Sequence, residues 1–140
     1  LHHIPHLCFP MLFSEFMCNF VVGMNLYGEG LCGVDAVIDK DKSSAQLAAD
    51  VKADKLIILT AVDHVYINFN RPNQQALSSV TVAQAERYIR EGHFAKGSML
   101  PKVEACIQFV RNHPAGQAVI TSLANAGNAL KGGNSTVITA

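Results

Sequence analysis

The sequence predicts an α/β fold with a mainly parallel sheet. One observation is the continuous apolar run "KLIILT" at Lys55–Thr60, which is typical of a parallel strand that is covered on both faces. A second is that segments of strand type alternate with segments of helical periodicity from Val34 onward. This alternation favours helices packed on a mainly parallel sheet.

The composition indicates one domain with a hydrophobic core. The chain has 140 residues, of which 49% are apolar, and this excludes a disordered chain. The formal net charge is zero, so bulk electrostatics indicate neither a nucleic acid nor an acidic membrane as a partner.

Residues 1–27 match no predicted element. Their apolar stretch Leu7–Met24 would fit a signal peptide or a membrane span, but it has no basic leader and polar residues interrupt it. We therefore expect no membrane role. His2, His3 and His6 would fit a metal site or a loose, tag-like terminus, and we favour the terminus.

The four cysteines show no metal-binding or redox spacing. Cys8, Cys18, Cys32 and Cys106 include no CxxC pair, and their scatter favours free thiols in a reducing compartment over a disulfide framework. We therefore expect a cytoplasmic protein.

The first elements after residue 33 are two strands with a helix between them. "VDAVI" at Val34–Ile38 has the length of a buried strand, a helix is predicted over Ser43–Ala53, and the strand Lys55–Thr60 follows. The residues expected on the inner face of this helix are Leu47, Ala48 and Val51. Asn68–Gln75 is rich in Asn and Pro, which predicts a loop.

Two helices with clear start signals come next. Thr81 opens the first, with Gln84 three residues later as its capping-box partner. A glycine-bearing loop over Glu91–Ser98 leads into the second, over Met99–Asn112. The positions expected to face the core are Val82, Ala85, Ile89, Met99, Val103, Cys106, Ile107 and Val110. The last predicted elements are a strand at Gln117–Ser122, a short helix within Leu123–Leu130 and a strand at Ser135–Thr139.

Four alternating charges follow the first predicted strand. A turn needs one or two polar residues, whereas this run has four charged ones: Asp39, Lys40, Asp41 and Lys42. Two interpretations remain open. In one, they form a solvated helix entry in which Asp41 or Ser43 is the N-cap. In the other, they form one wall of a site for a highly charged ligand.

Lys102 is a second candidate for charge chemistry. It falls in the first turn of a predicted helix, where the macrodipole disfavours a cation. The preceding "GSMLP" supplies a flexible glycine, Ser98 as an N-cap candidate and a proline near the helix start. Backbone N–H groups at such a start, joined by a lysine, would bind phosphate. A solvated surface lysine is the alternative, and position alone favours it.

Asp63 and Tyr66 lie in the segment that follows the strand Lys55–Thr60. Alone, they would be a turn residue and a half-buried aromatic residue. Ligands of parallel sheets bind beyond the carboxyl ends of the strands. This segment, the charged run and the helix start at Lys102 therefore indicate together a phosphorylated ligand with magnesium. No GxxxxGK[ST], no GxSxG and no convincing Cys–His pair is present, which excludes P-loop enzymes and common hydrolases.

Several motifs occur in order between about Glu29 and Ala140. They are "GVDAVIDKD", "LIILTAVDHVYINFNRPNQ", "VTVAQAERYI", "GHFAKGSMLPKVEACIQFV" and "AVITSL". Together they closely resemble the C-terminal half of the carbamate kinases, within the amino acid kinase family. "VIDKD" with "GSMLPKVEA" is highly specific, and "RPNQ" favours carbamate kinases over their relatives. The resemblance places an amino acid kinase domain at residues 28–140.

This resemblance implies the C-terminal, nucleotide-binding half of an open αβα sandwich, usually in a homodimer. The implied reaction converts carbamoyl phosphate and ADP reversibly to ATP and carbamate, with magnesium, at the end of arginine, agmatine or purine-derivative breakdown.

The resemblance also implies roles for single residues. Lys102 would stabilise charge on the transferred phosphoryl group, Lys40 would contact phosphate, and Asp41 would orient the lysines. Asp63 and Tyr66 would lie along the nucleotide. The residues expected to frame the nucleotide are Gly97, Ser98 and Met99.

The chain also departs from the family pattern. The N-terminal half, with its glycine-rich phosphate loops, another catalytic lysine and most of the carbamate site, has no counterpart in these 140 residues. Residues 1–27 resemble nothing in the family, and Lys96 replaces the usual proline of "FAPGS". We therefore carry two hypotheses: a carbamate kinase, or a catalytically inactive fragment of one that binds nucleotide.

Overall fold

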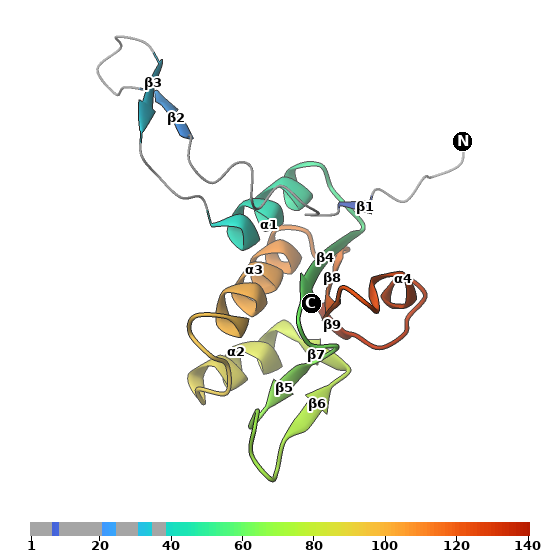
Figure 1. Ribbon diagram of the computed structural model, residues 1–140. Helices are drawn as coiled ribbons and strands as arrows, with labels where there is room; N and C mark the ends of the chain where they lie inside the picture. The colour runs from blue at the N-terminus through green and yellow to red at the C-terminus, as the bar shows by residue number, and fades with distance from the viewer. Residues whose placement is uncertain (1–6, 9–20, 25–30, 35–38) are drawn as a thin grey trace.

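The structure, a computed structural model, describes residues 7–8, 21–24, 31–34 and 39–140 (Figure 1). Within these residues, five strands form one sheet in the order β1-β4-β8-β9-β7. Their bounds are Leu7–Cys8 for β1, Lys55–Thr60 for β4, Gln117–Ser122 for β8, Thr136–Thr139 for β9 and Ser79–Thr81 for β7. β1, β4 and β8 pair in parallel, as do β7 and β9, whereas β8 and β9 are antiparallel. The predicted α/β class with a mainly parallel sheet is confirmed.

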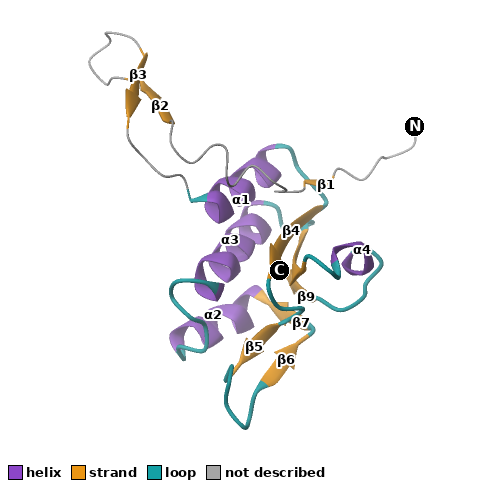
Figure 2. Ribbon diagram, in the orientation of Figure 1, coloured by secondary structure: helices purple, strands orange, loops and turns teal. Residues whose placement is uncertain are grey.

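Helices cover the sheet on two sides (Figure 2). The helices α1 (Lys40–Asp50), α2 (Val82–Arg90) and α3 (Met99–Asn112) share one core cluster with Leu56 and Ile58 of β4. Ile57 packs on the other side, in a cluster with Ala129 of α4 (Ala126–Ala129). Successive side chains of a strand point to opposite faces. A strand between two helical layers therefore has apolar side chains on both faces, as Leu56, Ile57 and Ile58 of β4 do.

In the described part of the chain, two short antiparallel pairs lie outside the main sheet. β2 (Val21–Met24) pairs with β3 (Leu31–Val34), and β5 (Val65–Ile67) pairs with β6 (Gln75–Leu77). The prediction of a loop at 68–75 holds up to residue 74, but neither the hairpin around it nor β7 was predicted. Residues 35–38, the rest of the predicted strand that begins at Val34, lie outside the described residues.

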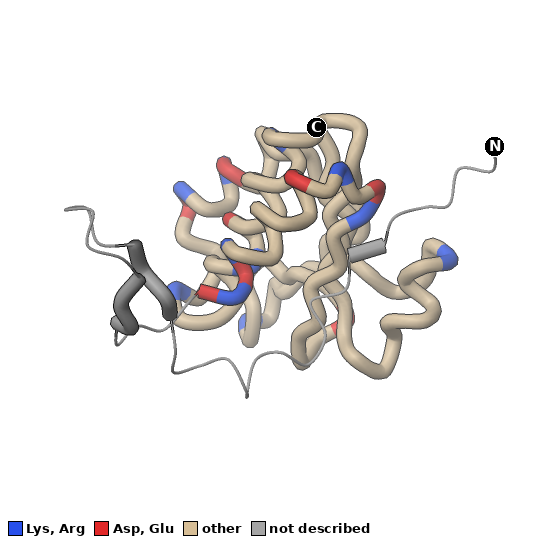
Figure 3. The backbone as a smooth tube through the Cα atoms, turned by 90° about the horizontal axis from the view of Figure 1, so that it is seen from above, with Lys and Arg blue, Asp and Glu red and all other residues tan. Residues whose placement is uncertain are grey.

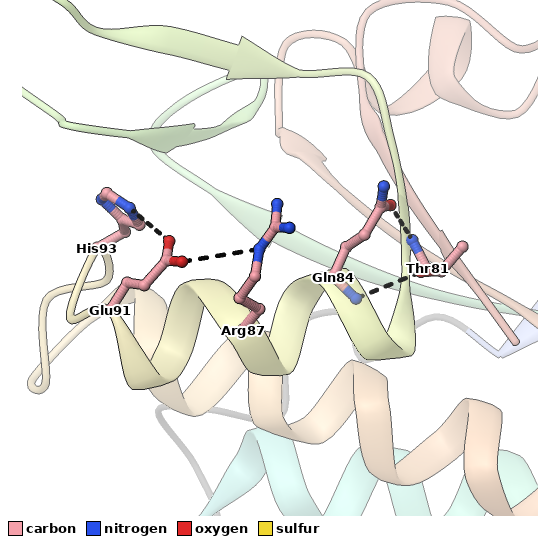
Figure 4. Close-up of polar contacts among 5 residues, drawn as sticks. All are labelled: Thr81, Gln84, Arg87, Glu91 and His93. Atoms are coloured by element: carbon pink, nitrogen blue, oxygen red, sulfur yellow. Dashed lines mark hydrogen bonds and ion pairs between the residues drawn. The ribbon is translucent and has the colours of Figure 1, made fainter.

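The predictions for α2 and α3 are confirmed. The Thr81 hydroxyl accepts a hydrogen bond from the Gln84 backbone, and the Gln84 side chain accepts one from the Thr81 backbone (Figure 4). At the far end of α2, Glu91 contacts Arg87 and His93. Ala85 of α2 and four of the expected positions of α3 are buried, while Val82, Ile89 and Met99 are partly buried against the core.

The prediction for α1 is wrong in two respects. The helix begins at Lys40 and ends at Asp50, so it lies about three residues earlier than expected. Of the three residues expected on the inner face, Ala48 is buried as predicted, together with Ala45, whereas Leu47 and Val51 are 55% and 52% exposed. Small side chains let α1 and α3 pack closely, and this packing turns Leu47 and Val51 outward.

Basic and acidic residues are interspersed over the helical side and the loops (Figure 3), as the balanced composition indicates. No helix within the described residues is long and apolar enough to span a lipid bilayer. Cys106 is a free, buried thiol. The side chains of Cys8 and Cys32, together with Cys18, His2, His3 and His6, lie outside what the structure describes.

Candidate functional site

A cleft of about 550 Å³ opens where α1 and α3 begin. It is lined by Asp39, Lys40, Asp41, Gly97, Ser98, Pro101 and Lys102. The two helices are neighbours in the layer that covers one face of the sheet (Figure 2). Two segments that are about sixty residues apart in the sequence therefore form the walls of one site.

A partly buried ion pair joins these walls. The Lys102 Nζ atom lies 2.9 Å from the Asp41 Oδ2 atom, and the two side chains are 17% and 14% exposed. Lys102 is therefore not the solvated surface lysine that its position alone favours. Its ammonium group is held at the edge of the cleft, where it can interact with an anion.

The start of α1 explains why Asp41 is available for this pair. Asp39, rather than Asp41 or Ser43, is the N-cap, because its Oδ1 atom accepts hydrogen bonds from the backbone N–H groups of Asp41 and Lys42. Because Asp39 caps the helix, the Asp41 carboxylate is left to pair with Lys102. Lys40 is exposed and lines the cleft.

The start of α3 supplies the opposite wall. Gly97 and Ser98 line the cleft, and a Cβ atom at Gly97 would meet nothing within 4 Å. Ser98 occupies the N-cap position as expected, but its side chain makes no capping hydrogen bond. Met99, the first residue of the helix, is partly buried against the core and does not line the cleft.

Cys106 lies near the ion pair but remains a neutral thiol. Burial raises the pKa of Cys106 far above its ordinary value, and the charge of Asp41 raises it further. A buried neutral thiol is a poor nucleophile. The cleft therefore offers charged groups, namely the Lys102–Asp41 ion pair and the exposed Lys40, rather than a reactive thiol.

Asp63 and Tyr66 form a separate group beyond the carboxyl end of β4. The Asn125 Nδ2 atom donates to Asp63 Oδ1 at 2.7 Å. Hydrogen bonds from the side chains of Ser122 and Asn125 hold the pKa of Asp63 below its ordinary value. The Tyr66 ring is half-buried and lies beside the Phe69 ring, with a centroid distance of 5.8 Å. Neither Asp63 nor Tyr66 lines the cleft.

Three residues around this group were not predicted from the sequence. Ser122 ends a predicted strand, so the rule that ligands bind beyond the carboxyl ends of parallel strands could have identified it, as it did Asp63. Asn125 falls inside the predicted short helix, and Thr136 inside the predicted last strand, where nothing in the local pattern marks either one. Thr136 is fully buried, and its hydroxyl accepts a hydrogen bond from the Val65 N–H group at 2.8 Å.

The described residues do not form a metal centre of their own. Among them, no group of three or more His, Cys, Asp or Glu could hold a metal ion. Asp39 and Asp41, the two carboxylates of the cleft, are already engaged with the helix start and with Lys102. Within the described residues, the expected magnesium therefore has no site made of three or more such side chains.

Comparison with known proteins gives one family. A model of the amino acid kinase family matches residues 17–122. A carbamate kinase of Staphylococcus haemolyticus (strain JCSC1435) is 60% identical over 106 residues, which cover 76% of this chain and 34% of that protein. A carbamate kinase of Oenococcus oeni is 60% identical over 112 residues, which cover 80% of this chain and 36% of that protein. The chain thus spans about a third of the length of these relatives.

A solved structure shows the same fold. The carbamate kinase of Giardia lamblia bound to AMP-PNP superposes with a TM-score of 0.78 at 37% identity, covering 84% of this chain and 36% of that one. This similarity confirms the predicted fold as a partial region of the amino acid kinase fold. The predicted boundary between residues 27 and 28 stays a prediction.

Proposed function

The chain belongs to the amino acid kinase family, and from this premise we propose that it is the nucleotide-binding part of a carbamate kinase. The proposed reaction is the reversible transfer of a phosphoryl group between carbamoyl phosphate and ADP, which gives ATP and carbamate. The identity of 60% to two carbamate kinases supports this reaction. The proposed setting is the cytoplasm, in the breakdown of arginine or related compounds, and the proposed assembly is a homodimer.

The observation that carries the proposal is the Lys102–Asp41 pair at the edge of the cleft. Enzymes catalyse phosphoryl transfer mainly by positioning the reactants and stabilising charge. Lys102 stabilises the negative charge that spreads over the transferred group, and Lys40 contacts phosphate oxygens. Asp41 holds the Lys102 ammonium group in one place, so little reorganisation is needed when charge develops.

The remaining candidate residues bind the nucleotide. Gly97 and Ser98 line the cleft at the start of α3, where the helix N-terminus favours anionic phosphate oxygens, and Met99 continues that frame. Asp63 and Tyr66 contact the nucleoside, the ring of Tyr66 offering a face or edge to the base. The Giardia lamblia carbamate kinase is bound to AMP-PNP, which supports a nucleotide as the ligand proposed here.

Magnesium is proposed to enter with the nucleotide. Mg²⁺ is commonly held by substrate phosphates and water with only one or two carboxylates. This mode agrees with the lack of a three-residue metal group among the described residues. When bound, the ion neutralises phosphate charge, and the side chains of this chain act beside it.

Calorimetry on the 140-residue chain tests the nucleotide proposal. ADP with magnesium is expected to bind the wild-type chain. Lys102→Ala is expected to weaken that binding at least ~10-fold, as for the loss of a charge-assisted hydrogen bond. Lys131→Ala is the matched control, because Lys131 is exposed and does not line the cleft. A folded chain that releases no heat with millimolar ADP would contradict the proposal.

The second candidate function is nucleotide binding without catalysis. The observation that favours it is the limited match, since the chain corresponds to about a third of each curated relative. An assay of ATP formation from carbamoyl phosphate and ADP by this same chain separates the two functions. ADP binding without ATP formation favours the second candidate for the 140-residue chain.

A further inference from the structure

A buried hydroxyl group helps to fasten the base of the β5–β6 hairpin to the main sheet. The Thr136 hydroxyl of β9 accepts a hydrogen bond from the Val65 N–H group at 2.8 Å and donates one to the Leu77 carbonyl oxygen. Thr136 is 0% exposed, and Val65 and Leu77 are also buried. A single side chain thus ties the first residue of β5 and the last residue of β6 to β9.

The hairpin depends on such ties because it is small. β5 and β6 pair with each other in a separate two-stranded sheet and are not strands of the main sheet. An isolated two-stranded hairpin of this length is marginally stable in water. Tyr66 directly follows Val65, so the place of its ring is set by where this strand is held.

The segment on the other side of Val65 is fastened by Asn125. The Asn125 side chain donates to Asp63 at 2.7 Å. Its backbone N–H group lies 3.1 Å from the carbonyl oxygen and 3.2 Å from the hydroxyl oxygen of Ser122, the last residue of β8. The end of β8 therefore fixes Asn125, and Asn125 fixes Asp63.

We propose that Thr136 and Asn125 are positioning residues for the nucleoside end of the nucleotide. They hold Asp63 and Tyr66 from two sides, through β9 and through the end of β8, and neither of them lines the cleft at the starts of α1 and α3. This inference rests on the proposed function, in which Asp63 and Tyr66 contact the nucleoside. The phosphate end is built instead from the starts of α1 and α3. Loss of either positioning residue should therefore weaken nucleoside recognition and spare phosphate binding.

Affinities for ADP and for inorganic pyrophosphate, both with magnesium, distinguish the two ends. Thr136→Val keeps the shape of the side chain but removes the hydroxyl, whereas Thr136→Ser keeps the hydroxyl. The valine variant should bind ADP about 10-fold more weakly, the scale of one lost buried hydrogen bond, and should bind pyrophosphate as the wild type does. The serine variant should restore the ADP affinity. A purely structural role would lower both affinities together.

Asn125→Ala is the second variant, and it tests the same inference if Thr136→Val does not fold. Asn125 is partly exposed, so its truncation leaves the core intact, and it too should weaken ADP binding but not pyrophosphate binding. Unchanged ADP affinity, or an equal loss for both ligands, would overturn the inference. A folded wild-type chain that binds neither ligand would instead overturn the proposed function, and the inference with it.

Discussion

The Lys102 ammonium group lies 2.9 Å from the Asp41 carboxylate, although 61 positions separate the two residues in the sequence. Each residue is in the first turn of its helix. The macrodipole of α1 favours Asp41 there, while that of α3 disfavours Lys102. The carboxylate therefore offsets an unfavourable position and keeps a cation at the start of α3, where it can meet a phosphate.

The first prediction concerns the stability of this pair. Asp41→Asn should lower the free energy of unfolding by about 1–3 kcal/mol, because it leaves a partly buried lysine without its counter-charge. Urea denaturation at neutral pH measures the loss. In the double variant Asp41→Asn with Lys102→Met, part of the stability should return, since no unpaired charge remains. Losses that simply add would show that the two side chains do not interact.

The second prediction compares two helix N-caps. Thr81→Ala should cost about 1 kcal/mol, because it breaks the capping box of α2. Ser98→Ala should change the stability by less than about 0.5 kcal/mol, since the Ser98 side chain makes no capping hydrogen bond in α3. Thermal unfolding of both variants is the measurement. A Ser98 variant as unstable as the Thr81 variant would contradict the structure.

These elements also show what the sequence alone can predict. The capping box at Thr81, the helix Met99–Asn112 and the strands Lys55–Thr60 and Gln117–Ser122 are confirmed. Their signals are local: a cap residue, a helical period, an apolar run. The hairpin of β5 and β6 carries no such local signal, because each of its strands has only three residues. The hairpin is held by Thr136, which is far away in the sequence.

For the candidate site too, the sequence predicts some features, while others depend on contacts between distant segments. The helical pattern predicts that Leu47, Ala48 and Val51 face the core. Only Ala48 does so, together with Ala45, because the close approach of α1 to α3 favours small side chains at their contact. The resemblance singled out Lys40, Asp41 and Lys102, which the structure brings to one cleft. It could not show which groups hold Asp63, because those contacts depend on the end of β8.

The third prediction concerns the pKa of Asp63. Hydrogen bonds from Ser122, and then from Asn125, lower it from the ordinary value of 3.8. Ser122→Ala should raise this pKa toward 3.8, and Asn125→Ala should raise it less, as NMR titration of the carboxyl carbon can show. A lowered pKa means that the folded state favours the ionised carboxylate. The stabilisation is therefore complete above pH 3.8 and is lost as the pH falls through the pKa of the folded state. Wild type and variants should differ in stability at neutral pH and converge in acid.

The fourth prediction concerns Gly116, which lies against two rings. A Cβ atom at this position would come within 2.7 Å of ring atoms of both Phe109 and His113. Phe109 is 0% exposed and cannot move aside, so Gly116→Ala should cost about 1–3 kcal/mol. Gly127→Ala is the control, because a Cβ atom there meets nothing within 4 Å. A fall of several degrees in Tm is expected for Gly116→Ala only, and equal Tm values for the two variants would contradict the packing.

The fifth prediction concerns catalysis. Residues 39–140 contain the cleft, the ion pair and the Asp63–Tyr66 segment. Where they replace the matching segment of the Staphylococcus haemolyticus carbamate kinase, the chimera should make ATP from carbamoyl phosphate and ADP. Lys102→Ala should then lower kcat at least ~10²-fold, the usual effect of losing one preorganised group that stabilises charge in the transition state. Lys131→Ala should leave kcat unchanged, because Lys131 is exposed and lies outside the cleft. If kcat of the Lys102 variant stayed within about threefold of the parent chimera, the ammonium group would not be stabilising charge during transfer, and its bond to Asp41 would serve the fold alone.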